Sequence, residues 1–270
     1  MLTILFLGDI VGEPGRSTVI AQLPRLKESL SVDFIVVNGE NVAGGRGITP
    51  KITIDLLRAG VSVITTGDHI WDQKEIISFI DTEPRLLRPV NYPPGAPGNG
   101  SIVLETAKGK VGVISVQMRT FMQPILENPF PAVEAAVAAM RLQTSLILVD
   151  AHGETTSEKI AIGRFLDGKV SAVIGTHTHV QTADEQIFPG GTAFLCDAGM
   201  CGPANSILGR SIDPIVNRFI SNLPALFPVA KGDVRLCGAL VSIDETNGRA
   251  LSITRVNELI SETPAPSPGA

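Results

Sequence analysis

Short runs of apolar residues recur along the chain, and each is followed by a polar or glycine-rich segment and then by a helix-like pattern. The runs are too continuous for half-exposed strands, so they predict strands buried on both faces, as in parallel sheets. Alternation of this kind predicts βαβ units with right-handed crossovers. The strands are expected at residues 2–8, 33–39, 61–67, 111–116, 145–150 and 171–176, and the helices at 16–30, 50–59, 72–82, 131–142 and 157–167.

The pattern changes after about residue 184, where short strands replace the alternation of strand and helix. The segment 189–191 is Pro-Gly-Gly and separates two short predicted strands. Residues 234–244 and 249–256, joined by a turn that contains Asn-Gly, predict an antiparallel β-hairpin. A parallel half followed by an antiparallel half predicts an α/β fold, in which two mixed β-sheets form a sandwich flanked by helices.

No segment is rich enough in Pro, Gly or Ser to separate two domains. Residues 1–258 are therefore expected to form a single domain. The Pro-rich segment 259–270 is expected to be a disordered tail.

The composition limits the class of function. Hydrophobic residues make up 44% of the 270 residues and charged residues 18%, which is typical of a globular protein with a sizeable core. The net charge of −5 argues against a DNA-binding protein. It leaves a small phosphorylated substrate open, because bound metals can supply local positive charge.

Neither a signal peptide nor a membrane span is expected from the apolar runs of the sequence. The first apolar run ends at Asp9, too early for a signal peptide, and no run reaches the roughly 20 residues of a membrane span. The low, odd count of three cysteines fits a reducing compartment. A cytoplasmic protein without membrane contact is therefore expected.

Residues that can bind metal follow the predicted strands. Asp9 and the pair Glu40-Asn41 each come directly after an apolar run, and so does every histidine of the chain within a few residues. In open α/β sheets, ligands bind outside the carboxyl ends of the strands, so these side chains are expected to converge. Histidine, carboxylate and carboxamide without thiolate suit Mn, Fe, Zn or Ni. The four histidines are His69, His152, His177 and His179.

Each of these residues also has a purely structural interpretation. Asp9 alone could be a helix cap, and His152 alone could be a buried histidine with satisfied hydrogen bonds. The pair His177 and His179 is the stronger signal, because residues i and i+2 of an extended segment point to the same side. The whole ordered set is improbable by chance, so a metal site is the preferred interpretation.

The ordered motifs resemble those of the calcineurin-like metallophosphoesterases, and among them the YmdB-like group of bacterial 2′,3′-cyclic-nucleotide 2′-phosphodiesterases. The resemblance extends from residue 2 to about residue 258. It implies a metallophosphoesterase-type sandwich that hydrolyses 2′,3′-cyclic nucleotides to 3′-nucleotides, and a homo-oligomer. The motifs are GDIVGEPGR (8–16), NGEN (38–41), GDHIWD (67–72), AHGETTSEK (151–159) and GTHTHVQTAD (175–184).

The resemblance also implies a role for each strand-end residue. Two metal ions are expected, Fe or Mn in the first place and Zn as a further possibility. Glu40 would bridge them, while His69 would not bind metal but would protonate the leaving oxygen. One metal would be held by Asp9, Glu40, Asn41 and His179, and the other by Glu40, Asp68, His152 and His177.

Position 68 departs from the family pattern, which usually has Asn there. Asp68 keeps a coordinating oxygen but adds a negative charge, and it cannot donate a hydrogen bond to phosphate as an amide can. Tighter metal binding is expected, together with weaker attraction for an anionic phosphate and a less acidic metal-bound water. The sequence therefore predicts a slower catalyst than the relatives.

Two arginines are candidate phosphate contacts. Arg46 follows the NGEN motif in a glycine-rich loop, and Arg119 lies in a loop after a predicted strand. For each, a solvated loop arginine is an equally good interpretation. Two alternative functions also stay open: a phosphoesterase for another phosphate substrate, and a catalytically weak, metal-binding regulatory protein.

Overall fold

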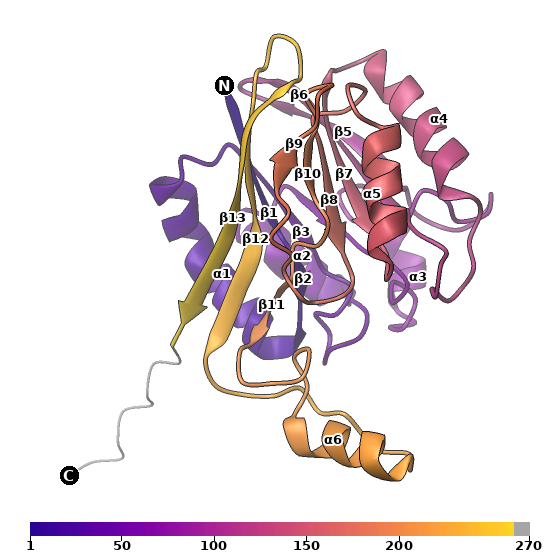
Figure 1. Cartoon of the computed structure of the whole chain (residues 1–270), viewed down its shortest axis with the longest axis vertical. Helices are drawn as coiled ribbons and strands as arrows, with labels where there is room; N and C mark the ends of the chain where they lie inside the picture. Colours follow the sequence, from indigo (N-terminus) through magenta and orange to yellow (C-terminus); the bar gives the residue numbers. More distant parts are fainter. Residues whose placement is uncertain (262–270) are drawn as a thin grey trace.

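The computed structural model describes residues 1–261 and consists of two mixed β-sheets that pack face to face between layers of helices (Figure 1). The predicted fold class is therefore confirmed. Alternate residues of β1 explain the layering. Leu2, Ile4 and Phe6 pack between the two sheets, whereas Leu5 and Leu7 pack against the helices outside the first sheet.

The first sheet combines strands from both ends of the described chain. Its order is β2-β11-β12-β1-β3-β4, and β13 pairs with the other edge of β12. β1, β3 and β4 are parallel, while β12 is antiparallel to β1. The strands are β1 (Leu2–Leu7), β2 (Asp9–Ile10), β3 (Phe34–Asn38), β4 (Val63–Thr65), β11 (Met200–Pro203), β12 (Val234–Ile243) and β13 (Ala250–Ile260).

The second sheet has the order β5-β6-β7-β8-β10-β9. Its four inner strands are parallel, and β5 and β9 lie antiparallel at its edges. The strands are β5 (Ser101–Thr106), β6 (Gly109–Gln117), β7 (Leu146–His152), β8 (Ala172–Thr176), β9 (Gln186–Ile187) and β10 (Ala193–Leu195).

Helices cover the outer faces of the sandwich. The buried faces of α1 (Gly12–Ser29) and α2 (Pro50–Arg58) pack on the first sheet, and those of α4 (Pro129–Arg141) and α5 (Thr156–Phe165) pack on the second. α2 begins where its sequence predicts, since the side chain of Thr49 accepts a hydrogen bond from the backbone N–H of Ile52.

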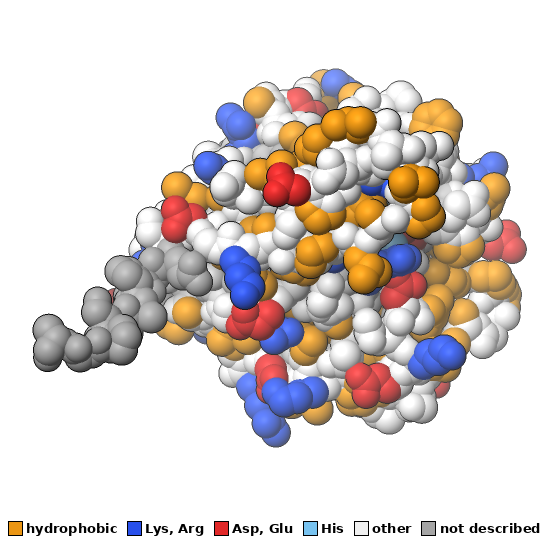
Figure 2. Space-filling model, turned by 90° about the horizontal axis from the view of Figure 1, so that it is seen from below, with side chains coloured by type: hydrophobic (Ala, Val, Ile, Leu, Met, Phe, Trp, Pro, Cys, Tyr) orange, Lys and Arg blue, Asp and Glu red, His pale blue; other side chains and the backbone are white. Residues whose placement is uncertain are grey.

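A further helix, α6 (Ile212–Ser221), projects from the end of the molecule where the inner strands finish (Figure 1). Viewed from that end, the surface is hollowed, and hydrophobic side chains gather around the hollow (Figure 2). Within residues 1–261, no helix is long and apolar enough to cross a membrane.

Several elements differ from the expectation. The segment 72–82 forms only the short α3 (Ile76–Phe79) and a 3₁₀ turn, η1 (Ile80–Thr82). α6 and β5 were not predicted, because neither follows the βαβ pattern of the earlier segments. β13 continues to Ile260, beyond the expected strand end at residue 256, because Ile260 still pairs with Val234. Residues 262–270 of the expected tail lie outside the described part of the chain.

Candidate metal centre and active site

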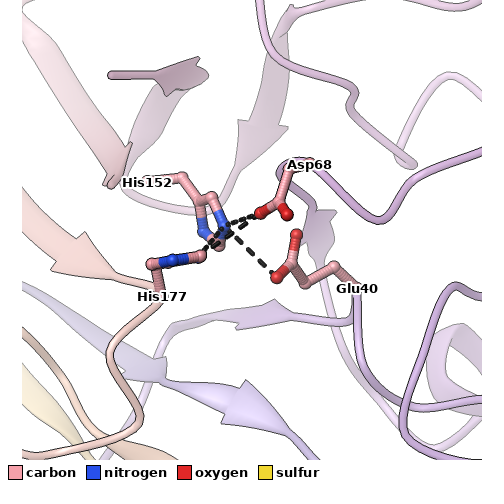
Figure 3. Close-up of side chains that lie close together, drawn as sticks. All are labelled: Glu40, Asp68, His152 and His177. Atoms are coloured by element: carbon pink, nitrogen blue, oxygen red, sulfur yellow. Dashed lines mark hydrogen bonds and ion pairs between the residues drawn. The ribbon is translucent and has the colours of Figure 1, made fainter. Parts of the chain in front are cut away.

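Four of the predicted metal-binding side chains meet at the ends of four strands. Glu40 follows β3, Asp68 follows β4, His152 ends β7 and His177 follows β8. One ligand atom from each lies within 4.8 Å of those of the other three. Figure 3 shows the four side chains pointing toward one another from separate segments. The parallel strands thus bring residues that are distant in sequence to one edge.

The distances within this cluster converge on His152. Its Nε2 atom lies 3.0 Å from Asp68 Oδ1, 3.2 Å from Glu40 Oε1 and 3.1 Å from His177 Nδ1. His152 is fully buried and Glu40 is 1% exposed, so water does not screen this group of charges. Two imidazole nitrogens and two carboxylates facing one point are a donor set that a first-row metal ion fits.

A second group forms around Asp9. Its Oδ2 accepts a hydrogen bond of 3.1 Å from the backbone N–H of His177. Its Oδ1 is buried without a hydrogen-bond partner among residues 1–261, and it lies 3.9 Å from His179 Nε2. A buried carboxylate oxygen without a partner costs free energy, and a cation at this point would remove that cost. The residues present therefore fit a second metal ion.

Asn41 joins the two groups. Its amide nitrogen lies 3.2 Å from His179 Nε2 and 3.1 Å from Glu40 Oε1. The amide oxygen and nitrogen of asparagine exchange places by a flip of the side chain, so the oxygen can face a cation at the same position. Glu40 consequently lies between the two groups; its role as a shared metal ligand stays a prediction.

The negative charge of the carboxyl groups in the cluster is balanced by the positive charge of histidine. Burial would raise the pKa of Glu40 and of Asp68, but the charge of His152 and the hydrogen bonds from His152 and His177 outweigh it, and both pKa values are lowered. Burial would lower the pKa of His152, yet Glu40 and Asp68 raise it well above its usual range. A bound cation would take over this charge balance and release the proton of His152.

Asp9 lacks such compensation. Burial raises the pKa of its carboxyl group, and the charges of His179 and His152 only partly oppose this effect. The group around Asp9 therefore gains most from a positive ion.

Thr176 fixes the orientation of His152. The Thr176 hydroxyl donates to Asp150 Oδ1 at 2.6 Å and lies 2.8 Å from His152 Nδ1. Because the single hydroxyl proton points to Asp150, Nδ1 must carry a proton and donate to Thr176. Nε2 then stays free to bind metal. Burial raises the pKa of Asp150 to about 6, although the hydroxyls of Thr65 and Thr176 oppose the shift.

The segment that carries His177 and His179 is not extended, so the geometric reason given for that pair was wrong. Both residues have positive φ angles, +104° and +64°. The two rings consequently face different groups: His177 lies 3.3 Å from Asp68, and His179 lies beside Asn41. A left-handed conformation costs roughly 1–2 kcal/mol for a residue with a side chain, so this loop needs support.

The buried ion pair of Lys159 and Asp197 provides that support. Lys159 Nζ lies 2.8 Å from Asp197 Oδ2 and also donates to the carbonyl of Thr176 at 3.3 Å. The same Asp197 oxygen accepts a hydrogen bond of 3.0 Å from the backbone N–H of Thr178. Both charged side chains are buried. The pair therefore holds the loop at both sides of His177.

His69 lies next to the cluster; its role as a proton donor stays a prediction. Its Nε2 atom is 3.7 Å from Asp68 Oδ2, and its Nδ1 atom is 3.0 Å from Asp72 Oδ2. Asp72 therefore holds a proton on Nδ1 and directs Nε2 toward the centre. Asp72 was not predicted as a functional residue, although its place three residues after His69 in the GDHIWD motif was a usable signal.

The two arginine candidates are placed differently. Arg46 Nε pairs with Asp72 Oδ2 at 2.8 Å, behind His69, and its side chain is exposed. The backbone N–H of Arg119 donates to the carboxylate of Glu158 at 3.1 Å. Within residues 1–261 the structure shows no hydrogen bond or ion pair of the Arg119 guanidinium. Substrate contact by either arginine stays a prediction.

A cavity of about 590 Å³ opens directly onto the centre. One wall is formed by Glu40, Asn41, His69, Glu154, His177 and His179. The other wall includes Arg210 and Arg218, which the sequence analysis did not identify because no motif surrounds them.

Comparison with known proteins agrees with the motifs. The YmdB-like protein family matches residues 5–256. A 2′,3′-cyclic-nucleotide 2′-phosphodiesterase of Bacillus subtilis is 46% identical over 255 residues, which cover 94% of this chain and 96% of that protein. The crystal structure of a novel phosphatase from Mycoplasma pneumoniae superposes with a TM-score of 0.90 at 32% identity, covering 97% of this chain and 94% of that one. A hypothetical protein from Thermus thermophilus has the same TM-score at 36% identity, covering 96% of this chain and 100% of that one.

Proposed function

Because the chain belongs to the YmdB-like family of metallophosphoesterases and is a phosphoric ester hydrolase, we propose that it converts 2′,3′-cyclic nucleotides to 3′-nucleotides with two metal ions. The observation that supports this proposal is the cluster of Glu40, Asp68, His152 and His177 at four strand ends, beside a cavity that Glu40 and His177 line. The substrate class follows the Bacillus subtilis relative, which is named for that reaction.

The proposed metal ligands follow the two groups of donors. Asp9, Asn41 and His179 would hold one ion together with Glu40, and Glu40, Asp68, His152 and His177 would hold the other. We propose Fe or Mn, with Zn as an alternative. Such ions, when bound, supply positive charge to the phosphate oxygens and lower the pKa of a bound water toward about 7.

His69 is the proposed general acid. Asp72 holds its Nδ1 atom at 3.0 Å, and its Nε2 atom is directed toward the centre. From there it would protonate the departing 2′ oxygen of the ribose, which leaves the phosphate on the 3′ oxygen. General acid catalysis of this kind contributes roughly 10²–10⁴-fold to the rate.

Asp68 favours a second candidate function, that of a metal-binding protein with weak catalysis. Hydrogen bonds from His152 and His177 outweigh burial and keep the Asp68 carboxyl ionised. The extra negative charge opposes an anionic substrate, whereas the amide of an asparagine would not.

The deciding experiment pairs metal analysis with hydrolysis of 2′,3′-cyclic AMP, on this chain and on Asp68→Asn. Two metal ions per chain and metal-dependent release of 3′-AMP are expected, with faster turnover in the variant. Two metals without hydrolysis in either protein would reject the substrate. Failure to bind Mn or Fe after supplementation would reject the centre itself.

The proposal includes a cytoplasmic location and a homo-oligomer. The three cysteines are buried and free, which fits a reducing compartment. Burial raises the pKa of Cys196 and of Cys237 to about 11, so these thiols are protonated and unreactive at neutral pH. Sedimentation velocity measures the oligomeric state directly.

A further inference from the structure

The wall of the cavity opposite the metal centre is formed by residues 207–229, here called the α6 cap. It contributes Leu208, Ile215, Arg218, Phe219 and Phe227 to the cavity lining. The centre contributes carboxylates and imidazoles to the other side. Figure 2 shows hydrophobic side chains around the hollow at this end of the molecule. The cavity therefore has one polar wall and one largely apolar wall.

The base of the cap is fixed to the rest of the site. The Arg210 guanidinium donates to the backbone carbonyls of Gly44 and Phe227, at 3.2 and 3.0 Å. The backbone N–H of Ser211 donates to the carbonyl of Pro228 at 2.9 Å, so the two ends of the α6 cap are joined to each other. The carbonyl of Leu208 lies 3.2 Å from His179 Nδ1. The apolar wall is thus held at a set position relative to the metal ligands.

Two aromatic rings of the cap line the cavity and remain open to solvent. Phe219 is 83% exposed and Phe227 is 40% exposed, whereas Ile215 is the buried residue of α6. Exposed aromatic rings in a cleft are energetically poor until a flat, apolar group covers them. Arg218 lies one position before Phe219, and its Nη1 atom donates to Asn222 Oδ1 at 2.7 Å, which restrains the guanidinium.

We propose that the α6 cap is the nucleobase-binding wall, with Phe219 stacking on the base and Phe227 closing the slot. This inference rests on the proposed function, because the metal centre would hold the cyclic phosphate. A nucleotide has an anionic end and a flat aromatic end, and the two walls of the 590 Å³ cavity match these ends. Stacking on an aromatic ring favours any base, since each base has a π-face.

The neighbouring residue Ile220 supplies a matched control. It is 78% exposed and adjacent to Phe219 on α6, but it is not part of the cavity lining. Leu226 is 90% exposed and also lies outside the lining. If the apolar side chains of the cap instead bind a second copy of the chain, substitutions of Ile220 and Phe219 should act alike. If they bind the base, only the substitution of Phe219, and not that of Ile220, should lower kcat/KM for the nucleotide.

The experiment compares Phe219→Ala and Ile220→Ala on two substrates: 2′,3′-cyclic AMP and methyl ribofuranoside 2′,3′-cyclic phosphate, which has no base. Phe219→Ala should lower kcat/KM for the nucleotide roughly 10-fold, mainly through KM, and leave the base-free substrate within about twofold. Ile220→Ala should change neither substrate. An equal fall in kcat/KM for both substrates in Phe219→Ala would overturn the inference, and so would an unchanged kcat/KM for both.

Calorimetric titration of 3′-AMP and of inorganic phosphate into the metal-loaded protein separates this inference from the proposed reaction. Phe219→Ala should weaken 3′-AMP binding roughly 10-fold and leave phosphate binding unchanged, even if the chain hydrolyses neither substrate. Unchanged 3′-AMP binding would reject the base-binding wall. A fall in the sedimentation mass of both variants, without a base-dependent effect, would assign the cap to an interface between copies.

Discussion

The two walls of one cavity are built in opposite ways. The inner wall carries Glu40 and rests on buried strand ends, where Asp9, Glu40 and His152 are each at most 1% exposed. The outer wall is one short helix and its flanking loops, with Phe219 largely exposed. The proposed chemistry therefore rests on a rigid sandwich, whereas the proposed recognition rests on one short helix and its flanking loops. Such a division lets a family change its substrate without disturbing its metal centre.

The largest expected effect belongs to the inner wall. His69→Ala should lower kcat for 2′,3′-cyclic AMP by about 10²–10⁴-fold, because it removes the proposed proton donor. Metal content, measured by plasma emission spectrometry, should stay near two ions per chain, since His69 lies outside the proposed ligand set. Loss of metal in this variant would make His69 a ligand and contradict its role as an acid.

The ion pair of Lys159 and Asp197 lies behind the inner wall, and breaking it tests whether this pair stabilises that wall. Lys159→Met should lower the free energy of unfolding by about 3–5 kcal/mol in urea titrations, because Asp197 is then left as a buried, uncompensated charge. The matched control is Lys169→Met, which removes an exposed partner of Glu134 and should cost about 0–1 kcal/mol. Equal effects of the two substitutions would show that the buried pair does not support the histidine loop.

The candidate metal centre on the inner side could be predicted from the sequence because its residues follow apolar strands. Asp9, Glu40 and His152 lie where the pattern of buried strands put them, and the resemblance supplied Asp68. The outer wall could not be read in this way. Phe219 and Arg218 belong to a helix outside the βαβ alternation, and only three-dimensional closure brings them to the cavity. The positive φ angles of His177 and His179 could not be predicted for a similar reason, since the loop is held by Lys159 and Asp197 from elsewhere in the chain.

Removal of the Thr176 hydroxyl, which orients His152, is expected to have a smaller effect, on metal affinity. Thr176→Val keeps the shape of the side chain but removes the acceptor for His152 Nδ1, so metal affinity should fall about 10–100-fold. Titration of the metal-free protein with Mn²⁺ measures the change. Thr178→Val is the control, because within residues 1–261 the Thr178 hydroxyl makes only two long, exposed hydrogen bonds, both with the backbone of Val180. A Thr176→Val protein with unchanged affinity would remove Thr176 from the orienting role.

The smallest predicted effect concerns the attachment of the outer wall. Gly45 has a φ of +91°, and a Cβ atom there would lie 2.3 Å from the guanidinium of Arg210. Gly45→Ala should cost about 1–2 kcal/mol of stability and also raise KM by displacing the α6 cap. Gly60→Ala has a comparable backbone strain, at a φ of +108° with no atom within 4 Å, and should leave KM unchanged. Equal KM values in the two variants would show that Arg210 does not set the position of the cap.

The place of β12 in the first sheet determines when, during synthesis of the chain, this sheet can be completed. β1 pairs with β12 over Leu2 to Leu7, so one of the first strands to be made waits for one of the last. Until residues 234–243 emerge, a nascent chain carries Asp9 and Glu40 beside an unpaired strand edge. Such an edge is prone to wrong pairing, so protection by a chaperone is needed most in that interval. Binding of the proposed metal ions would then follow translation of the C-terminal hairpin.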